Sequence, residues 1–302
     1  MKFSKLLLTS AFSLSLLLAG CGSGGEKAVN ENADNTNKDS KEEKTVELVA
    51  GSKLQDGTYQ LSEKDFDEHG WKVNFEITVK DGKITESDFD YINEEGTLKS
   101  EDEKYQEIMK EKSGVGPAEF IPELNEQLVE KQDASQVDIV SGATSSSEIF
   151  INYAQQLIQA AQKGDTNPIE IDAQGELKDG EYSLEEKNIG STGWKTYIKM
   201  TVENGKITDV DYNYVNADGQ LKTDDEEYQK KMTEKSGTGP KDFIPELSNS
   251  LIEKQNAGEV EIVTGATHSS HSFKMYAAQL INAAQKGDTT PIEIDNFVYE
   301  EK

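Results

Sequence analysis

One heptapeptide occurs twice in this chain, and its two copies set the register of the whole sequence. Residues 138–144 read DIVSGAT and residues 261–267 read EIVTGAT, so the second copy follows the first by 123 positions. The same offset aligns most of the chain beyond its N-terminal part without a gap, and it pairs the two tryptophans, Trp71 and Trp194. A repeat of this length predicts two tandem copies of one domain, at residues 46–168 and 169–302, each folded around its own core.

The first 20 residues predict an export signal. Two lysines precede an apolar stretch at residues 6–18, which is short for a membrane-spanning helix, and LAGC at residues 18–21 resembles a bacterial lipobox. The resemblance implies cleavage before Cys21, the single cysteine, and a lipid on it that anchors the chain to the outer face of the cell membrane. An ordinary secretory signal with a chance cysteine is the alternative. Residues 21–45 are almost free of apolar side chains and predict a flexible acidic and polar tether.

The formal charge of −27, from 31 basic and 58 acidic residues, argues against a nucleic-acid partner because a phosphate backbone would be repelled. The simplest interpretation of the acidity is that it keeps an exported protein soluble.

Within each repeat, alternating patterns come first and helical patterns follow. Residues 71–92 predict a β-hairpin, residues 101–112 a charged surface helix and residues 117–131 a second helix. A third helix follows the heptapeptide and ends at Lys163-Gly164, because basic residues and glycine favour helix C-termini. The fold class is therefore α+β, with two tandem domains that each pack a small antiparallel sheet against helices.

A strand pattern flanks the repeats three times. Residues 46–50, 169–173 and 292–296 share the same offset. Three copies around two domains do not decide whether this strand opens or closes a repeat.

The heptapeptide places a threonine after a turn of small residues and directly before a helix. A helix N-terminus has unpaired N–H groups and a partial positive charge, so it favours a phosphate. Gly142 and Ala143 allow an anion to approach the backbone closely, and the neighbouring hydroxyls are further ligands. The alternative is an ordinary helix cap, because serine and threonine are preferred there.

Both copies, each with an acidic residue three positions before the Ser/Thr-Gly-Ala-Thr string, resemble the flavinylation motif of FMN-binding domains. Such domains occur in sodium-pumping and Rnf-type redox subunits and in exported bacterial flavoproteins. The resemblance implies that Thr144 and Thr267 each carry FMN through a phosphoester bond. An ApbE-type flavin transferase would install the FMN from FAD, with magnesium present. The remaining cofactor-binding residues that it implies are Asp138, Ser141, Gly142 and Ala143 in the first copy and Glu261, Thr264, Gly265 and Ala266 in the second. Glu261 departs from the aspartate of the first copy.

The same resemblance, with the lipobox and the tether, implies a lipid-anchored electron carrier on the outside of a Gram-positive cell. It would take electrons from a membrane NADH dehydrogenase or the quinone pool and pass them to extracellular acceptors such as ferric iron. This is a redox relay more than an enzyme with a substrate pocket, and the signal peptide could in addition yield a peptide pheromone. The alternative is a non-redox, ligand-binding lipoprotein of the cell envelope.

Three further groups of residues are candidates of lower weight. Four aromatic residues could stack on flavin rings, although a repeated tryptophan is more simply a core residue. Two histidines after the second motif have the spacing of metal ligands, but the first repeat lacks them. A carboxylate pair on the hairpin is interpreted as solvated. These groups are Trp71, Trp194, Tyr105 and Tyr228; His268 and His271; and Asp88 and Asp90.

Overall fold

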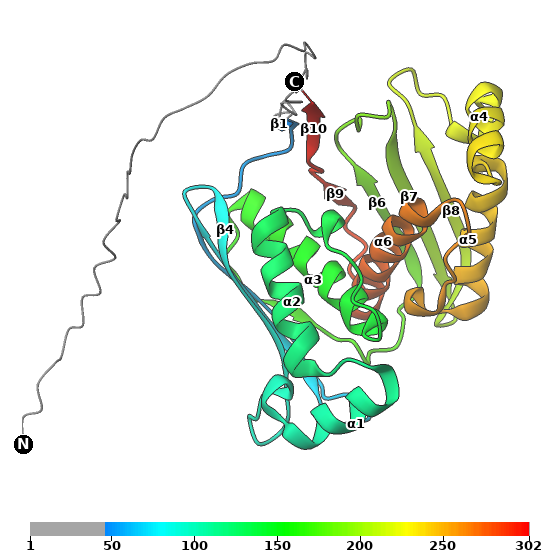
Figure 1. Ribbon diagram of the computed structural model, residues 1–302. Coiled ribbons are helices and arrows are strands. Elements are labelled where there is room, and N and C mark those ends of the chain that lie inside the picture. The colour runs from blue at the N-terminus through cyan, green and yellow to red at the C-terminus, as the bar shows by residue number, and fades with distance from the viewer. Residues whose placement is uncertain (1–45, 302) are drawn as a thin grey trace, which may run out of the picture. The chain divides into compact units, whose positions relative to one another are not determined.

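The computed structural model describes residues 46–301 (Figure 1). The predicted signal peptide, Cys21 and the predicted tether lie outside these residues. The described residues form one compact unit that contains both repeats, and each repeat encloses its own cluster of buried apolar side chains. None of the helices in the described part of the chain is both long and apolar enough to cross a bilayer.

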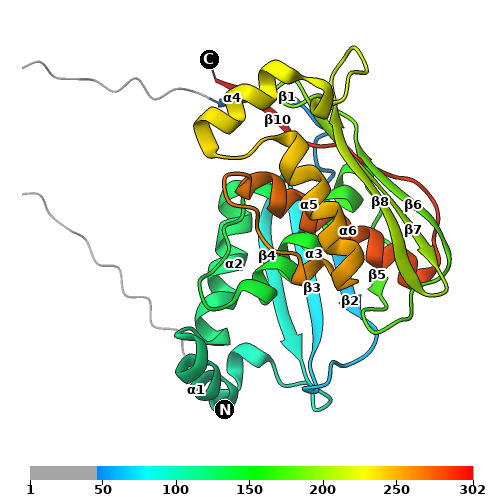
Figure 2. The ribbon, with the colours of Figure 1, turned by 90° about the vertical axis from the view of Figure 1, so that its right-hand side faces the viewer.

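The first repeat is a four-stranded sheet with helices α2 and α3 on one of its faces (Figure 2). Side chains alternate between buried and exposed along the central strand, as expected for a sheet that is covered on one side. Its elements are β2 (Gly57–Glu63), β3 (Lys72–Lys80), β4 (Lys83–Ile92), the 3-10 turn η1 (Lys99–Glu101), α1 (Glu103–Ser113), α2 (Pro117–Lys131), the 3-10 turn η2 (Ala134–Gln136), α3 (Thr144–Lys163) and β5 (Ile169–Ile171).

The second repeat has the same elements in the same order (Figure 1). They are β6 (Gly180–Glu186), β7 (Lys195–Glu203), β8 (Lys206–Val215), η3 (Lys222–Asp224), α4 (Glu226–Ser236), α5 (Pro240–Lys254), η4 (Ala257–Glu259), α6 (Thr267–Lys286) and β9 (Ile292–Ile294). The strand orders, β4-β3-β2-β5 and β8-β7-β6-β9, are equivalent. The α+β class with helices packed on small sheets is thereby confirmed.

The flanking strand closes a repeat. β5 pairs with β2, in parallel, through Leu61↔Ile169 and Glu63↔Ile171, and β9 pairs with β6 in the same way. Each sheet is therefore antiparallel with one parallel edge strand, which the sequence did not predict. The boundary between the repeats falls after Ile171, and not between residues 168 and 169 as expected, because the strand after α3 hydrogen-bonds to the first repeat.

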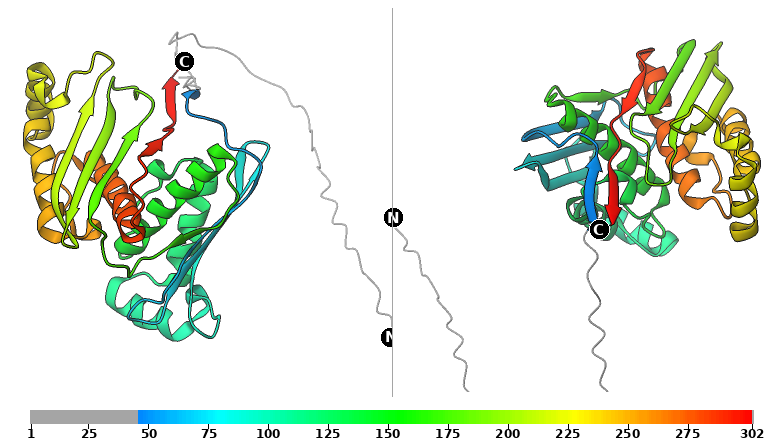
Figure 3. Two further views of the ribbon diagram at one scale, coloured as in Figure 1. Left: turned by 180° about the vertical axis from the view of Figure 1, so that it is seen from behind. Right: turned by 90° about the horizontal axis from the view of Figure 1, so that it is seen from above.

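The remaining copy of the strand pattern pairs elsewhere. β1 (Val46–Ala50) forms a separate two-stranded antiparallel sheet with β10 (Val298–Glu301). The first and the last described strands consequently lie side by side (Figure 3). Three similar stretches therefore have two different roles, which their own residues do not distinguish.

The expected hairpin and helices are confirmed, with small shifts at their ends. The hairpin turns at Asp81-Gly82, which both have positive φ as an Asp-Gly turn of this kind requires. Helix α1 begins at Glu103, two residues later than expected, because the Asp102 side chain caps it by accepting from the Tyr105 amide. Helix α3 ends where predicted, at Lys163 with Gly164 in the left-handed conformation.

Candidate functional site

Each heptapeptide forms a tight turn that only glycine can make. Gly142 has φ +81°, and a Cβ on it would overlap the carbonyl oxygen of Ser113. Gly265 has φ +84°, and its Cβ would overlap the carbonyl oxygen of Ser236 in the same way. The glycine is thus required by a contact inside the protein, with the last residue of the first helix of its repeat, Ser113 of α1 or Ser236 of α4. This differs from the reason expected from the sequence, which was close approach of an anion.

A buried serine holds the turn to the helix that follows it. The Ser147 hydroxyl donates to the Ala143 carbonyl at 2.9 Å and accepts from the Val140 amide at 3.0 Å. Ser270 makes the same two bonds, to Ala266 and from Val263, at 3.0 and 3.1 Å. Both serines are fully buried. They fix the turn and are not available as phosphate ligands, although the hydroxyls near the motif were expected to be further ligands.

The threonines are exposed at helix starts that no side chain caps. Thr144 is the first residue of α3 and Thr267 the first of α6. The N-cap residues are Ala143 and Ala266, and neither helix has a side-chain cap. The cap interpretation of the motif is therefore wrong for both threonines. Exposed hydroxyls beside uncapped amide groups are a donor set that fits a phosphate.

The acidic residues that precede the two turns differ in their surroundings. Asp138 is exposed, its carboxylate lies 2.6 Å from the Lys131 ammonium, and its amide donates to the Gln127 side chain. Glu261 is exposed and has no ion pair or side-chain hydrogen bond within residues 46–301. Both carboxylates are open to an approaching protein. The first is held by its neighbours and the second is not.

Close to each turn, a buried lysine lies among three aromatic rings. Lys99 is 6% exposed, and its ammonium lies 5.4 Å from the ring centre of Trp71, 4.2 Å from Tyr91 and 4.6 Å from Tyr105. The rings face a cation with their negative π-surfaces, which partly replaces lost hydration. Burial nevertheless lowers the pKa of Lys99, against the opposing effect of nearby carboxylates. We call this group the first cage.

The second cage repeats this arrangement around Lys222. Its ammonium lies 5.6 Å from Trp194, 4.2 Å from Tyr214 and 4.5 Å from Tyr228. Burial lowers the pKa of Lys222 to about 8, opposed by Glu186. The four aromatic candidates from the sequence, together with Tyr91 and Tyr214, thus form two cages. The tryptophans are buried in the cores, as the simpler interpretation had it, and Trp194 also lines a cavity.

The cages contact the motif helices. Burial raises the pKa of the Tyr91 hydroxyl, and a hydrogen bond from Ser146, two residues after Thr144, opposes that shift. In the second repeat Ser269 does the same for Tyr214, whose pKa is raised to about 12. Each caged lysine is therefore one aromatic side chain away from the first turn of its own motif helix.

A half-buried glutamate ties the sheet to the motif helix in both repeats. Glu63, at the end of β2, accepts from the Tyr153 hydroxyl of α3 at 2.6 Å and from the Val73 amide of β3 at 2.9 Å. Burial raises its pKa, and the two hydrogen bonds lower it. Glu186 has the same two partners, Tyr276 at 2.7 Å and the Thr196 amide at 2.6 Å.

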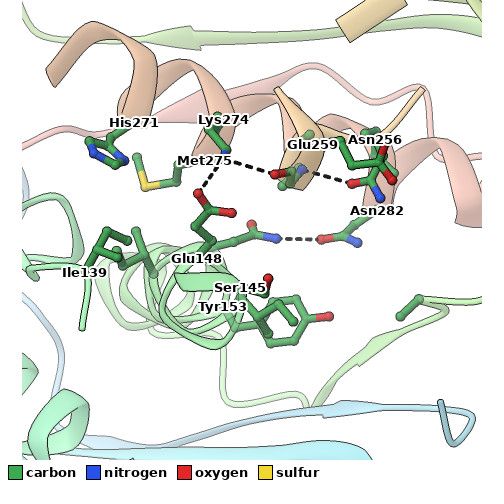
Figure 4. Close-up of a pocket in the computed structure, with 18 of the residues that line it drawn as sticks. Ile139, Ser145, Glu148, Tyr153, Asn256, Glu259, His271, Lys274, Met275 and Asn282 are labelled. Carbon is green, nitrogen blue, oxygen red and sulfur yellow. Dashed lines mark hydrogen bonds and ion pairs between the residues drawn. The ribbon is translucent and has the colours of Figure 1, made fainter. Parts of the chain in front are cut away.

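The two repeats meet at α3 and α6, which border a cavity of about 1190 Å³ (Figure 4). Figure 4 shows the Glu148 carboxylate directed from α3 to the Lys274 ammonium of α6, at 2.5 Å. Thr267 lines this cavity, and a second cavity of about 460 Å³ lies beside the second cage. The smaller volume is in the range of small-molecule sites, about 300 to 1,000 Å³, and the larger volume is somewhat above it.

The carboxylate pair and the histidine pair that the sequence singled out each divide into one exposed and one half-buried residue. Asp88 is exposed, but Asp90 is half-buried and accepts from the Ser100 hydroxyl and the Tyr91 amide, so the interpretation of both as solvated is wrong for Asp90. His268 is exposed, and burial lowers the pKa of the half-buried His271. Within residues 46–301, no group of three His, Cys, Asp or Glu side chains is arranged to hold a metal ion.

Sequence reasoning missed the caged lysines, the half-buried glutamates and the role of the buried serines in the motif turns. One signal was available, because Lys99 and Lys222 correspond at the repeat offset within stretches that otherwise vary. A lysine is seldom buried, so periodicity alone gave no reason to place it in a core.

Fold and site together define an α+β domain, present twice, with an exposed threonine beside free amides at a helix start, a donor set that fits a phosphate. The model of the FMN-binding domain matches residues 69–159 and 193–282, together more than half of the chain. The chain therefore belongs to the FMN-binding domain family, and FMN is the ligand of that family.

Relatives from bacteria match a part of the chain about as long as one repeat. The 15 kDa lipoprotein of Treponema pallidum (strain Nichols) is 40% identical over 118 residues, which are 39% of this chain and 84% of the relative. A crystal structure of a protein from Clostridium perfringens is 42% identical and covers 39% of this chain and 98% of its own, with a TM-score of 0.38. A solution structure of a protein from Clostridium thermocellum is 30% identical and covers 36% and 92%, with a TM-score of 0.25.

Proposed function

We propose that this chain is a lipid-anchored electron-transfer flavoprotein that carries two FMN groups as phosphoesters of Thr144 and Thr267. The observation that carries the proposal is the exposed threonine at an uncapped helix start, found in the same form in both repeats. Membership of the FMN-binding domain family supports FMN as the ligand at both positions.

The residues of the motif have distinct roles in this proposal. The Thr144 hydroxyl forms the ester, and the free amides of the first turn of α3 hold the remaining phosphate oxygens. Ser147 and Gly142 keep the turn in place, so the threonine is positioned before the ligand arrives. Asp138 is the exposed acid that an ApbE-type flavin transferase would read, with Glu261 in that role in the second repeat. When bound, FMN supplies redox chemistry, and the protein supplies position and electrostatics.

The N-terminal sequence and a relative support the proposed location, and the partners are part of the proposal. The lipobox-like LAGC at residues 18–21 and the lipoprotein relative in Treponema pallidum support a lipid on Cys21 and a place on the outer face of the membrane. There the chain would accept electrons from a membrane NADH dehydrogenase or quinol and deliver them to extracellular acceptors such as ferric iron. A pheromone released from the signal peptide is a separate proposal, which the described residues do not bear on.

In-gel flavin fluorescence tests the attachment sites. The chain is produced with the transferase and FAD, denatured and compared with Thr144→Ala, Thr267→Ala and the double variant. We expect each single variant to keep about half of the fluorescence and the double variant to lose it. Ser145→Ala is the matched control, because Ser145 is an exposed hydroxyl on the same turn. A double variant as fluorescent as the wild type would overturn the proposal.

A non-redox ligand-binding lipoprotein is the competing function, and the cavity between the repeats is the observation that favours it. The two functions differ in covalent chemistry. FMN-sized mass increments on the threonine peptides support the electron carrier, and their absence with the transferase present supports the receptor.

A further inference from the structure

The two cages have the same lysine and the same rings, but the carboxylates around them differ. Lys99 is influenced by Glu63, Asp67 and Asp90, whereas Lys222 is influenced by Glu186 alone. The glutamates correspond to each other at the repeat offset. The two aspartates have no acidic counterpart, because Gly190 and Asn213 occupy their positions.

Both aspartates lie against the first cage. The Asp67 carboxylate accepts from the Trp71 amide at 2.8 Å, and the Asp90 carboxylate accepts from the Tyr91 amide at 2.7 Å. Asp90 also accepts from the hydroxyl of Ser100, the residue next to Lys99. Two of the three cage rings therefore belong to residues that donate their amide to an aspartate.

The second repeat keeps this backbone without the charges. The Gly190 amide donates to the Trp194 carbonyl at 2.9 Å, as the Asp67 amide donates to Trp71 at 2.7 Å. Asn213 accepts from the Tyr214 amide at 2.8 Å and donates to the Thr223 hydroxyl at 2.9 Å. The replacement of Asp90 by Asn213 thus removes a negative charge and retains a polar network at the same place.

Each cage borders a cavity, but the cavities do not separate the two attachment sites, because Thr267 lines the larger one. The larger cavity, to which Glu63, Asp67 and Tyr91 contribute, is lined by five carboxylates and one lysine. The smaller cavity, beside the second cage, is lined by three carboxylates (Asp133, Glu186 and Asp295) and by Lys222. His268 lines both cavities.

We propose that the two attachment sites have different reduction potentials, with the flavin on Thr267 the better electron acceptor, because fewer carboxylates surround the caged lysine beside it. This inference rests on the proposed function. Reduction adds negative charge to the flavin ring, and nearby carboxylates disfavour added negative charge whereas a lysine favours it. In each cage, a single tyrosine side chain separates the lysine from the motif helix. These charges are largely removed from solvent, so screening by salt is weak.

The difference in reduction potential sets the direction of electron transfer within the chain. Two electrons and one proton leave the reduced, anionic flavin on Thr144, which becomes oxidised. The same two electrons and proton reach the oxidised flavin on Thr267, which becomes reduced and anionic. The exchange is balanced between the two groups and needs no further reactant. The first repeat is then the entry site for electrons and the second repeat the exit site.

Potentiometric titration of single-flavin chains tests the inference. Full-length Thr267→Ala carries flavin only on Thr144, and Thr144→Ala only on Thr267, with loading counted by peptide mass. We expect the Thr267 flavin to be favoured at least tenfold in the equilibrium between the two, which is about 30 mV for a two-electron couple. Equal potentials, or the reverse order, on chains that carry FMN would overturn the inference and leave the proposed function intact. Absence of FMN from both chains would overturn both.

Charge exchange between the repeats tests the cause. Asp90→Asn, added to Thr267→Ala, should raise the potential of the Thr144 flavin, and Asn213→Asp, added to Thr144→Ala, should lower that of the Thr267 flavin. Asp88→Asn is the matched control, because Asp88 is an exposed carboxylate on the same strand as Asp90. The control should not move the potential. A shift with Asp88→Asn as large as that with Asp90→Asn would overturn the role of the cage.

Discussion

The motif turns of the two repeats are built alike, because each has a buried serine that bonds to the turn and a backbone carbonyl packed against its glycine. The surroundings of the caged lysines differ. Three carboxylates act on Lys99 in the first repeat, and one acts on Lys222 in the second. The shared part is geometry that any phosphoester on the threonine requires. The part that differs is electrostatic, and it can change without moving the backbone. Under the two proposals, attachment is common to the two repeats and the redox properties of the attached groups are specific to each.

The largest expected loss of stability comes from substitution of the glycine in either motif turn, the feature that both repeats share. Gly142→Ala or Gly265→Ala should cost about 2 to 5 kcal/mol, from a left-handed alanine and from overlap with a backbone carbonyl. We expect flavin loading to fall at the altered repeat and to persist at the other. Gly114→Ala is the control, because Gly114 has φ +85° and open space around its Cβ position, so only the cost of about 1 to 2 kcal/mol for the backbone conformation remains. Urea unfolding measures the loss of unfolding free energy in each variant. A cost of Gly114→Ala equal to that of Gly142→Ala would contradict the packing argument.

The next effect concerns the second cage and has a defined pH window. Because the pKa of Lys222 is about 8 in the folded chain and near 10.5 when unfolded, the unfolded chain binds more protons between these values. The free energy of unfolding should therefore rise from pH 8 towards pH 10. Lys222→Met should flatten this rise and stabilise the chain at pH 7 by about 1 to 3 kcal/mol, since desolvation of the ammonium outweighs its contacts with the rings. A slope unchanged in Lys222→Met would show that another group causes it.

The buried serines give a smaller effect that should be the same in both repeats. Ser147→Ala and Ser270→Ala each leave a buried amide, of Val140 or Val263, without its partner, which costs about 1 to 3 kcal/mol. Thermal unfolding with Ser145→Ala as the exposed control measures it. A cost confined to one repeat would show that the two turns are not held alike.

The smallest expected effect is on the rate of flavin transfer, and it comes from exchange of the acidic residues Asp138 and Glu261 between the two motifs. Glu261→Asp gives the second motif the residue of the first, and Asp138→Glu does the reverse. We expect Glu261→Asp to speed flavin transfer to Thr267 by less than about tenfold, under about 1.4 kcal/mol in activation free energy. The rate of fluorescence gain with purified transferase measures it. A faster reaction of Asp138→Glu at Thr144 would reverse the expected preference.

The sequence predicted the local structure well because the signals were local. The Asp81-Gly82 turn, the helix that starts at Pro117 and the glycine after Lys163 each depend on a few neighbouring residues. The position of the motif at a helix start follows from the same kind of signal. The absence of a cap, by contrast, became evident only from the structure.

The parts that were missed depend on contacts between distant segments. β5 joins β2 across more than 100 residues, and the three similar strand patterns do not encode which partner each takes. The first cage brings together residues from before β3, from β4, from η1 and from α1, so no spacing reveals it. Asp90 was misplaced for the same reason, because its partner Ser100 lies beyond the strand that carries it.

The central claim is that both threonines carry FMN, and peptide mass spectrometry of the full-length chain made with the transferase tests it most directly. The account predicts an FMN phosphoester increment on the peptide with Thr144 and on the peptide with Thr267, lost separately in Thr144→Ala and Thr267→Ala. Unmodified peptides at both positions, with the transferase shown to be active on another substrate, would contradict it.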